Sequence, residues 1–345
     1  MPTTQRTELN QLGEFGLIDR IKQPFEQKQH TETRKGIGDD AAVIDYGQDF
    51  YTLHSTDLLI EGVHFDLSYM PLKYLGYKAV AVNVSDIAAM NGIPQQILVS
   101  IAVSNRFSVE AIDEIYEGIA EACQNYRLDL IGGDTTTSRA GLVLNISIIG
   151  KVKKNKITYR SGARENDILC VTGDLGAAYL GLQILEREKQ VFLANPHAEP
   201  QLEGKDYIVQ KQLKPEARTD IVYELDELGI IPTAMIDISD GLASEILHLC
   251  KQSNVGAVIF EDKLPIEDIS WLTAQELNLP IMTCALNGGE DYELLFSIAQ
   301  KDFEKVNKIA DVSPIGYITS ADKKATLRTK SGTVYPLEAQ GWKHF

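Results

Sequence analysis

Apolar segments with strand-like and helix-like patterns alternate along the whole chain. The strand-like segments are short runs rich in β-branched and aromatic residues, and the helical ones repeat their apolar residues every three or four positions. The expected strands are 50–56, 97–103, 142–149, 168–173, 257–261, 281–286 and 292–298. The expected helices are 8–23, 71–91, 108–127, 176–188, 216–229, 241–253 and 300–310. This alternation predicts an α/β or α+β fold, because such strands and helices pack as layers.

A polar, basic segment, residues 151–168 (KVKKNKITYRSGARENDI), interrupts this alternation near the middle of the chain. A chain of 345 residues is long enough for two domains of ordinary size. We therefore expect one domain over residues 1–155 and a second over residues 156–345.

Local signals indicate several boundaries. We expect the helix over 71–91 to begin at Pro71, and the helix over 108–127 to use Ser108 as its N-cap. The strand over 50–56 should end at Asp57, and the prolines and glycine of 189–206 predict an exposed loop there.

The chain carries a large excess of negative charge. It has 49 acidic side chains (Asp plus Glu) and 33 basic ones (Lys plus Arg), a formal net charge of −16. A non-specific nucleic-acid or anionic-membrane binder requires a basic face, so the sequence predicts neither kind of partner. The first residues lack the apolar segment of a signal peptide, no apolar run is long enough to cross a membrane, and the four cysteines form no C-x-x-C pair. These features predict a cytoplasmic protein.

The most informative carboxylates lie in six short motifs that combine them with small residues. Four of these motifs follow apolar segments that resemble strands: FYTLH, LDLI, TAMI and IMTCAL. In α/β folds, ligands bind where strands end and helices begin, and small residues let the backbone approach a ligand closely. The motifs are Gly38-Asp39-Asp40, Ser55-Thr56-Asp57, Ser85-Asp86, Gly132-Gly133-Asp134, Asp237-Ile238-Ser239-Asp240-Gly241 and Gly288-Gly289-Glu290-Asp291.

Each motif by itself is also typical of a helix cap or a turn. Asp86 differs, because it lies inside an apolar helical pattern, where a carboxylate is costly unless it has a partner. Carboxylates that gather at one site repel each other unless cations lie between them. Oxygen ligands of this kind suit Mg²⁺, which completes its coordination with water and substrate phosphate. The six motifs together therefore predict metal-dependent phosphate chemistry.

Several familiar nucleotide and catalytic motifs are absent from the sequence. It contains no P-loop signature, no G-x-G-x-x-G between a strand and a helix, and no protein-kinase H-R-D or D-F-G motif. It also contains no G-x-S-x-G nucleophile elbow. These absences exclude the corresponding enzyme classes.

The ordered set of motifs resembles the thiamine-monophosphate kinase family, within the ATP-dependent superfamily typified by AIR synthetase. The segments that carry the resemblance are GIGDDAAV, STDLLIEGVHF, YKAVAVNVSDIAAMNG, LIGGDTT, YRSGA, VTGDLG, IDISDGL, NGGEDYELLF and, at residues 341–345, GWKHF. The resemblance implies two α/β domains, with the N-terminal domain forming a β-barrel across a homodimer and the C-terminal domain an α/β sandwich. It also implies transfer of a phosphoryl group from ATP to thiamine monophosphate, assisted by several Mg²⁺ ions.

The resemblance assigns roles to residues at matching positions. The implied metal ligands are Asp40, Ser55, Thr56, Asp57, Asp86, Asp134, Asp237 and Asp240, of which Asp57, Asp86, Asp134 and Asp237 are expected to be catalytic. The implied ATP contacts are Gly133, Asp134, Arg160 and Ser239. The implied contacts to thiamine monophosphate are His64, Glu290 and Trp342. Whether Asp39 shares the role of its neighbour Asp40 stays open.

An acceptor that is already an ionised phosphate needs little acid–base assistance. The site must instead align two anions and stabilise the charge on the transferred group. We therefore expect direct in-line transfer without a phosphoenzyme.

Other members of the superfamily are alternatives to this interpretation. Selenophosphate synthetases use a cysteine or selenocysteine near the N-terminus, but the first cysteine here is Cys123. The hydrogenase-maturation relatives end in a functional cysteine, whereas this sequence ends in Lys343-His344-Phe345. AIR synthetase does not explain the segment GWKHF. From a different class, a non-catalytic nucleotide-binding or metal-binding module stays open.

Overall fold

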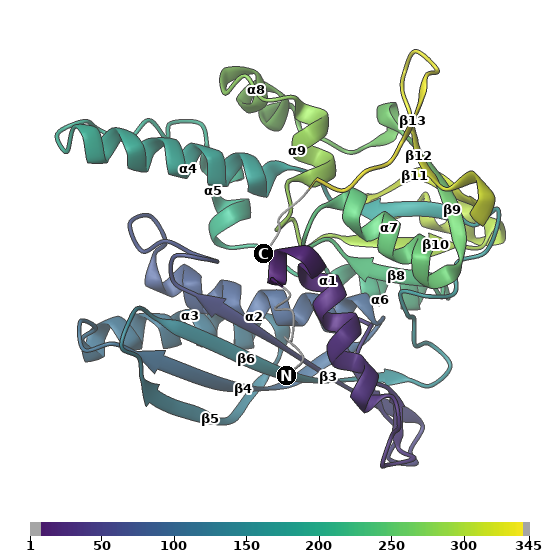
Figure 1. Ribbon diagram of the computed structural model, residues 1–345, viewed down its shortest axis with the longest axis horizontal. Helices are drawn as coiled ribbons and strands as arrows, with labels where there is room; N and C mark the ends of the chain where they lie inside the picture. The colour runs from purple at the N-terminus through teal and green to yellow at the C-terminus, as the bar shows by residue number, and fades with distance from the viewer. Residues whose placement is uncertain (1–7, 341–345) are drawn as a thin grey trace, which may run out of the picture.

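Two open β-sheets, one in each half of the chain, form the framework of the protein (Figure 1). The computed structural model describes residues 8–340. The first sheet has the strand order β1-β2-β3-β6-β4-β5, and the second has the order β13-β12-β9-β11-β7-β10-β8. The expected α/β architecture with two layered units is confirmed. Neither sheet of the described chain closes on itself, so one chain alone does not form the expected barrel.

The elements of the first half surround the first sheet. Its strands are β1 (Thr33–Lys35), β2 (Ala42–Ile44), β3 (Phe50–Ile60), β4 (Ile93–Val103), β5 (Asp129–Thr137) and β6 (Val143–Lys153). Its helices are α1 (Leu9–Lys22), α2 (Leu72–Ala89) and α3 (Val109–Tyr126), with a short 3₁₀ helix at Gln23–Phe25. Neighbouring strands are antiparallel except for β4 and β5, which are parallel.

The elements of the second half surround the second sheet. Its strands are β7 (Ile168–Thr172), β8 (Ala234–Asp237), β9 (Val255–Phe260), β10 (Leu294–Ile298), β11 (Val312–Ser320), β12 (Ala325–Arg328) and β13 (Val334–Pro336). Its helices are α4 (Ala177–Ala194), α5 (Asp206–Leu213), α6 (Thr219–Glu227), α7 (Leu242–Ser253), α8 (Asp268–Glu276), α9 (Ile281–Asn287) and α10 (Phe303–Val306). Short 3₁₀ helices occupy Glu261–Lys263, Gln300–Asp302 and Ala321–Lys323.

Helices cover both faces of the second sheet. Leu242, Ile246 and Leu249 of α7 pack on one face, in a cluster with Leu169 and Ile236 of the sheet. The opposite face packs against α6 and α10, through a separate apolar cluster that includes strands β7, β8 and β10. This layering is that of an α/β sandwich, as expected.

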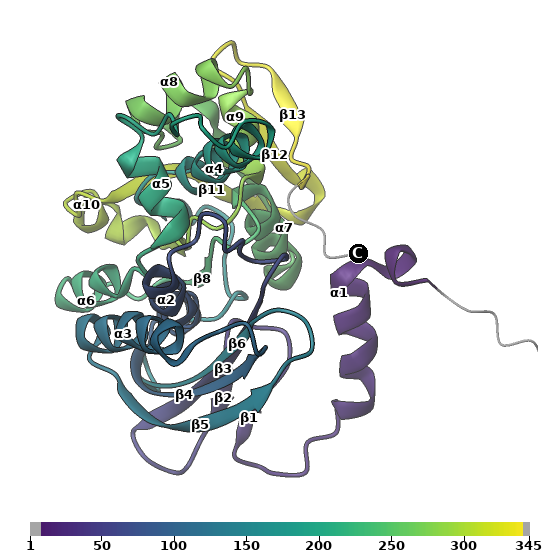
Figure 2. The same cartoon turned by 90° about the vertical axis from the view of Figure 1, so that its left-hand side faces the viewer.

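Helix α2 lies between the first sheet and the second half of the molecule (Figure 2). It is apolar on nearly all sides and buried along most of its length, as expected for a helix with protein all around it. Ala88 and Ala89 at its end join the cluster beneath β7, β8 and β10. Any polar side chain on α2 is therefore held in a fixed place between the two halves.

Sequence patterns located some boundaries correctly. Helix α2 begins after Pro71, and Ser108 caps α3 by accepting a hydrogen bond from the backbone N–H of Ala111 at 3.3 Å. Strand β3 does not end at Asp57 but continues to Ile60, because it pairs with β6 over its whole length.

Three other expectations were wrong, at least in part. Residues 281–286 form helix α9 and not a strand, and Pro280 stands at its N-cap. A short apolar run fits either structure, and proline before the first turn favours a helix. The helix expected over 300–310 is reduced to two short pieces, and α4 extends to Ala194 into the segment expected to be a loop.

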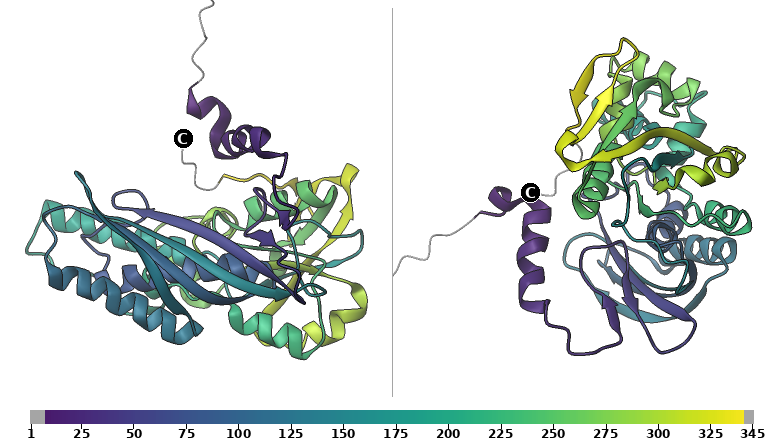
Figure 3. Two further views of the ribbon diagram at one scale, coloured as in Figure 1. Left: turned by 90° about the horizontal axis from the view of Figure 1, so that it is seen from below. Right: turned by 90° about the vertical axis from the view of Figure 1, so that its right-hand side faces the viewer.

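Helix α1 stands apart from both sheets, at the side of the molecule where its two halves meet (Figure 3). An ion pair of 3.7 Å between Asp19 and Lys251 links this helix to α7 in the second half. No helix within residues 8–340 combines the length and apolar character needed to cross a membrane.

Candidate active site

A large cleft opens between the two halves of the molecule. Its volume is about 1540 Å³, and β3, α2, α4, α7 and the loops after β1, β8 and α9 contribute to its lining. Most of the residues that the sequence singled out lie on this lining. They are Asp40, Ser55, Thr56, Asp57, His64, Asp86, Arg160, Asp237, Ser239, Asp240 and Glu290.

Three carboxylates from distant parts of the sequence meet in this cleft. Asp40 comes from the turn before β2, Asp86 from the last turns of α2, and Asp237 from the end of β8. Each offers one oxygen, and these oxygens lie within 4.8 Å of one another. The three motifs therefore converge on a single cluster, as the sequence predicts.

Neighbouring hydroxyl groups orient this cluster. The hydroxyl of Ser85 donates to Asp237 Oδ2 at 2.7 Å, which links α2 to β8. Ser55 Oγ lies 2.5 Å from Asp86 Oδ2 and 3.1 Å from the carbonyl oxygen of Asp40. Because Ser55 belongs to β3, the first sheet, α2 and the second sheet are tied together at the cluster.

Burial raises the pKa of the carboxyl groups in the cleft. It raises the pKa of Asp40 to about 6 against the opposing effect of Arg160, and it raises that of Asp57 to about 6 as well. The pKa of Asp86 lies well above its usual value, through burial first and then through repulsion from Asp57 and Asp237. Burial also raises the pKa of Asp237. A site of this kind favours protons or metal ions, because either removes the repulsion.

Arg160 brings a positive charge to the cluster. Its Nε and Nη2 lie 3.0 Å and 2.5 Å from Asp40 Oδ1. Its backbone N–H donates to Asp39 Oδ1 at 2.9 Å, and Lys35 Nζ lies 3.1 Å from Asp39 Oδ2. Asp39 thus contacts Lys35 and the backbone of Arg160, whereas its neighbour Asp40 joins the carboxylate cluster.

The loop between β8 and α7 forms another wall of the cleft. Ser239 is exposed there, and the backbone N–H of Asp240 donates to Glu245 Oε1 at 3.1 Å. Burial and the charge of Asp240 raise the pKa of Glu245 well above its usual value. Gly241, with φ of 114°, lets the chain turn into α7.

A second group of polar residues lies at another part of the cleft. His64 follows β3, and its Nδ1 accepts the backbone N–H of Ile60 at 3.0 Å, so the neutral ring carries its proton on Nε2. The carboxylate of Glu290 contacts Lys78 Nζ at 3.0 Å and accepts from Gln212 Nε2 at 2.6 Å. Both partners come from other elements, α2 and α5.

Other predicted residues are not brought to the cluster. Gly133 and Asp134 lie on the exposed edge strand β5 and do not line the cleft. In the strand register, β6 and β4 lie between Asp57 and Gly133, a separation of about 14 Å across three strand spacings. The hydroxyl of Thr56 accepts from Asn145 on the opposite face of β3. Trp342 lies outside the described residues.

Sequence reasoning missed three polar residues that shape the cleft or contact its lining: Lys78, Gln212 and Glu245. Lys78 carried a usable signal, since it is a lysine in an otherwise apolar helical pattern, eight residues before Asp86. Gln212 and Glu245 lie in ordinary amphipathic helices, and nothing in their local sequence distinguishes them.

Comparison with known proteins finds relatives that cover both halves of the chain. Residues 38–152 match the family described as AIR synthase related protein, N-terminal domain, and residues 164–327 match the corresponding C-terminal domain. A thiamine-monophosphate kinase of Bacillus subtilis (strain 168) is 35% identical over 97% of this chain and 100% of its own length. One from Aquifex aeolicus (strain VF5) is 34% identical over 98% of this chain and 99% of its own.

The chain belongs to the thiamine-monophosphate kinase family. A solved structure described as AaThiL complexed with AMPPCP and TMP superimposes with a TM-score of 0.84, at 32% identity, over 99% of this chain and 100% of that one. A HypE–HypF complex shares the fold, with a TM-score of 0.72 at 20% identity. Two groups of polar residues therefore line the cleft of this family member: the acidic cluster and the group around Glu290.

Proposed function

We propose that this protein transfers the terminal phosphoryl group of ATP to thiamine monophosphate, giving ADP and thiamine diphosphate. The observation that carries the proposal is the convergence of Asp40, Asp86 and Asp237 in a cleft large enough for two substrates. The full-length likeness to kinases of this name supports it. The related AaThiL structure holds AMPPCP and TMP, a nucleotide and an acceptor that this cleft would take.

The acidic cluster fits divalent cations. Its three carboxylates offer oxygens close together, and the buried Oδ2 of Asp40 has no hydrogen-bond donor within residues 8–340. Carboxylate oxygens are ligands that Mg²⁺ accepts, so these residues with Asp57 and Asp240 would hold several Mg²⁺ ions. When bound, Mg²⁺ neutralises phosphate charge and acts as a Lewis acid on the transferred group.

The residues of the chain align the two anionic substrates. Arg160 presents a planar guanidinium beside Asp40, a group suited to bind phosphate oxygens in pairs. Ser239 and the start of α7 offer a hydroxyl and backbone N–H groups to a phosphate. On the acceptor side, His64 and Glu290 line the cleft, and Trp342 is an aromatic partner for the cationic ring of thiamine.

We further propose that the transfer is direct and in line. The acceptor phosphate is already a nucleophile near neutral pH, so the chain need not supply a base. The acidic residues around the cluster are suited to bind metal ions and not to become phosphorylated, since burial favours their protonated or metal-bound forms.

A coupled assay tests this function. Purified protein with Mg²⁺ and ATP should release ADP when thiamine monophosphate is added, and the product should have the mass of thiamine diphosphate. Thiamine, which lacks the phosphate, is the matched control and should give no ADP above background. ADP release that does not depend on thiamine monophosphate would contradict the proposal. A phosphorylated protein detected by intact mass during turnover would overturn direct transfer alone.

We also propose a cytoplasmic homodimer that forms through β5. All residues of this edge strand are exposed, including Leu130 and Ile131, which are 45% and 54% exposed. An exposed edge strand with apolar side chains is prone to pair with another chain. A second copy at this edge would join the two open sheets towards a closed barrel and place Asp134 beside another protomer.

A further inference from the structure

Lys78 is a fully buried cation with a defined set of partners. Its side chain is 1% exposed, and its Nζ lies 3.0 Å from Glu290 Oε1 and donates to the carbonyl oxygen of Gln212 at 3.1 Å. Removing an ammonium group from water is costly unless it is paired. Loss of the contact with Glu290 should therefore disturb both the fold and the cleft, which loss of an exposed ion pair would not do.

Glu290 is held by both of its carboxylate oxygens. Lys78 contacts Oε1, and the Nε2 group of Gln212 donates to Oε2 at 2.6 Å. Gln212 is itself only 3% exposed, whereas the side chain of Glu290 is 29% exposed and lines the cleft. A glutamate side chain with two fixed oxygens loses its usual rotamer freedom before a ligand arrives.

The backbone at Glu290 is fixed as well. Glu290 has φ of 59°, an unusual left-handed conformation for a glutamate. Its backbone N–H donates to the carbonyl oxygen of Ser239 at 2.7 Å, and that of Tyr292 donates to Ile238 at 2.9 Å. The loop is thus tied to the chain that follows Asp237, so the acceptor part of the cleft is joined to the metal cluster.

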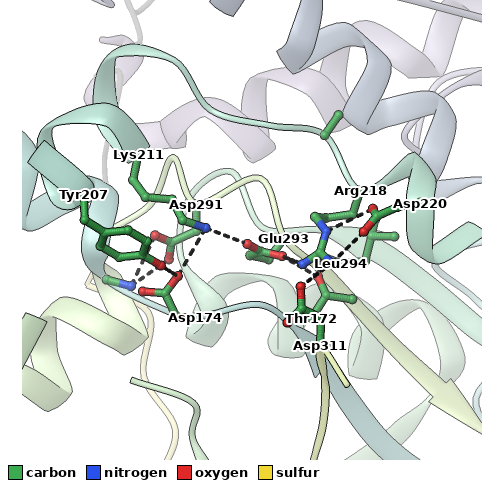
Figure 4. A network of polar contacts seen from close by, with 12 residues as sticks. Thr172, Asp174, Tyr207, Lys211, Arg218, Asp220, Asp291, Glu293, Leu294 and Asp311 are labelled. Carbon is green, nitrogen blue, oxygen red and sulfur yellow. Dashed lines mark hydrogen bonds and ion pairs between the residues drawn. The ribbon is translucent and has the colours of Figure 1, made fainter. Parts of the chain in front are cut away.

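A buried polar network holds the residues that follow Glu290 (Figure 4). Glu293 contacts Lys211 at 3.0 Å and Arg218 at 2.7 Å, and Asp291 accepts the backbone N–H of Gly176 at 3.0 Å. Lys211 and Gln212 are neighbours on the short helix α5. This one helix therefore supports both the network and Glu290.

We propose that Lys78 is a positioning residue for the acceptor substrate, acting through Glu290. Together with Gln212 it fixes the carboxylate that the proposed function assigns to thiamine monophosphate, and the inference rests on that assignment. Lys78 and Asp86 lie eight residues apart on α2, which places them about 12 Å apart along the helix axis. The rigid helix thereby sets the separation between the acceptor contact and the metal cluster.

The test compares KM values for the two substrates in Lys78→Met. We expect the KM for thiamine monophosphate to rise about tenfold or more, because Glu290 loses a charged hydrogen-bonding partner. The KM for ATP should stay within about twofold, since Asp86 and Asp40 are unchanged. Calorimetric binding of thiamine monophosphate should weaken by the same factor as KM rises.

Lys214→Met is the matched control. Lys214 stands two residues after Gln212, forms an ion pair of 2.5 Å with Glu121 and lies 4.5 Å from the ring of Tyr77, but it does not line the cleft. It should change neither KM. Equal changes in both KM values for Lys78→Met, or no change, would overturn the role of Lys78.

A double variant and a second single variant keep the test decisive. In the Glu290→Gln background, Lys78→Met should add little to the KM for thiamine monophosphate, whereas independent roles would multiply the two effects. If Lys78→Met does not fold, Gln212→Met removes the other contact to Glu290 and should also raise this KM selectively. A wild-type protein that makes no thiamine diphosphate would defeat the proposed function itself, whereas an active wild type with unselective variants would defeat only the inference about Lys78.

Discussion

At the scale of single residues, the acidic cluster is a place where burial opposes negative charge. Asp40 and Asp57 have pKa values raised to about 6. Between pH 4 and 6 both therefore keep a proton in the folded protein that they would release in the unfolded chain. Because the folded protein binds these protons more tightly, their contribution to stability is present at low pH and is lost as the pH rises through 6. A metal ion that replaces the protons should restore that stability.

This competition predicts pH-dependent Mg²⁺ binding. Titration of Mg²⁺ into the protein without nucleotide should show weaker binding at pH 5.5 than at pH 8, because protonated carboxyl groups must first lose their protons. The heat should depend on the ionisation enthalpy of the buffer near pH 6, and Asp237→Asn should reduce the binding. Equal affinity at both pH values and in all buffers would contradict the prediction.

Asp291 offers a separate test, away from the cluster. Burial raises its pKa to about 8, and the charge of Asp174 adds to the rise, against the backbone N–H of Gly176 and the charge of Lys211. The folded state should thus lose stability as the pH rises from 6 to 8, by an amount on the order of 1–3 kcal/mol over that range. Asp291→Asn keeps an oxygen for Gly176 and should remove this part of the loss. Thermal unfolding of both proteins at pH 6 and pH 8.5 measures it, and identical slopes with pH would contradict the assignment.

At the scale of elements, the crossing of α2 and α3 positions Lys78, Ser85 and Asp86. The two helices meet at Gly76 and Gly118, where an added Cβ would lie 2.0 Å from the carbonyl oxygen of Ile115 and 1.8 Å from that of Lys73. Neither backbone can yield without separating the helices. Gly118→Ala should therefore reduce the free energy of unfolding by about 2–4 kcal/mol in denaturant titrations.

Gly36→Ala is the control for this prediction, since its added Cβ would meet no atom within 4 Å and its φ is not in the left-handed range. It should change stability by less than about 1 kcal/mol. If Gly118→Ala is as stable as Gly36→Ala, the close approach of the helices is not what holds α2 in place.

Local sequence patterns predicted some elements correctly and others wrongly, because only some of them depend on neighbouring residues alone. Asp86 within an apolar helix and Ser108 before an amphipathic one gave signals that depend only on neighbouring residues. The six-residue run 281–286 did not, because an apolar segment of that length fits a strand or a buried helix. The contact of Lys78 with Glu290 joins residues that are 212 positions apart, and no local pattern encodes it.

At the scale of the whole molecule, the motif Gly132-Gly133-Asp134 is a part of the predicted site that residues 8–340 of a single chain do not bring to the cleft. Asp134 lies on exposed β5, at an edge where we propose that a second copy binds. In a two-fold dimer each protomer presents the same edge to the other, and we propose that Asp134 acts at the metal cluster of its partner, because within its own chain it lies three strand spacings from Asp57. The other chain would then complete each site.

Mixing two inactive variants tests this arrangement. Asp57→Asn and Asp134→Asn should each lose most activity as homodimers if both residues act at the site. After exchange of subunits, half of the dimers contain one copy of each variant, and in these one of the two sites has both natural residues, so activity should recover to about a quarter of the wild-type value. Each variant alone should show no recovery. The mixture should also stay inactive when both variants carry Ile131→Glu, a change that should make them monomeric by light scattering. If the mixture stays inactive although subunits have exchanged, Asp134 does not complete the partner's site.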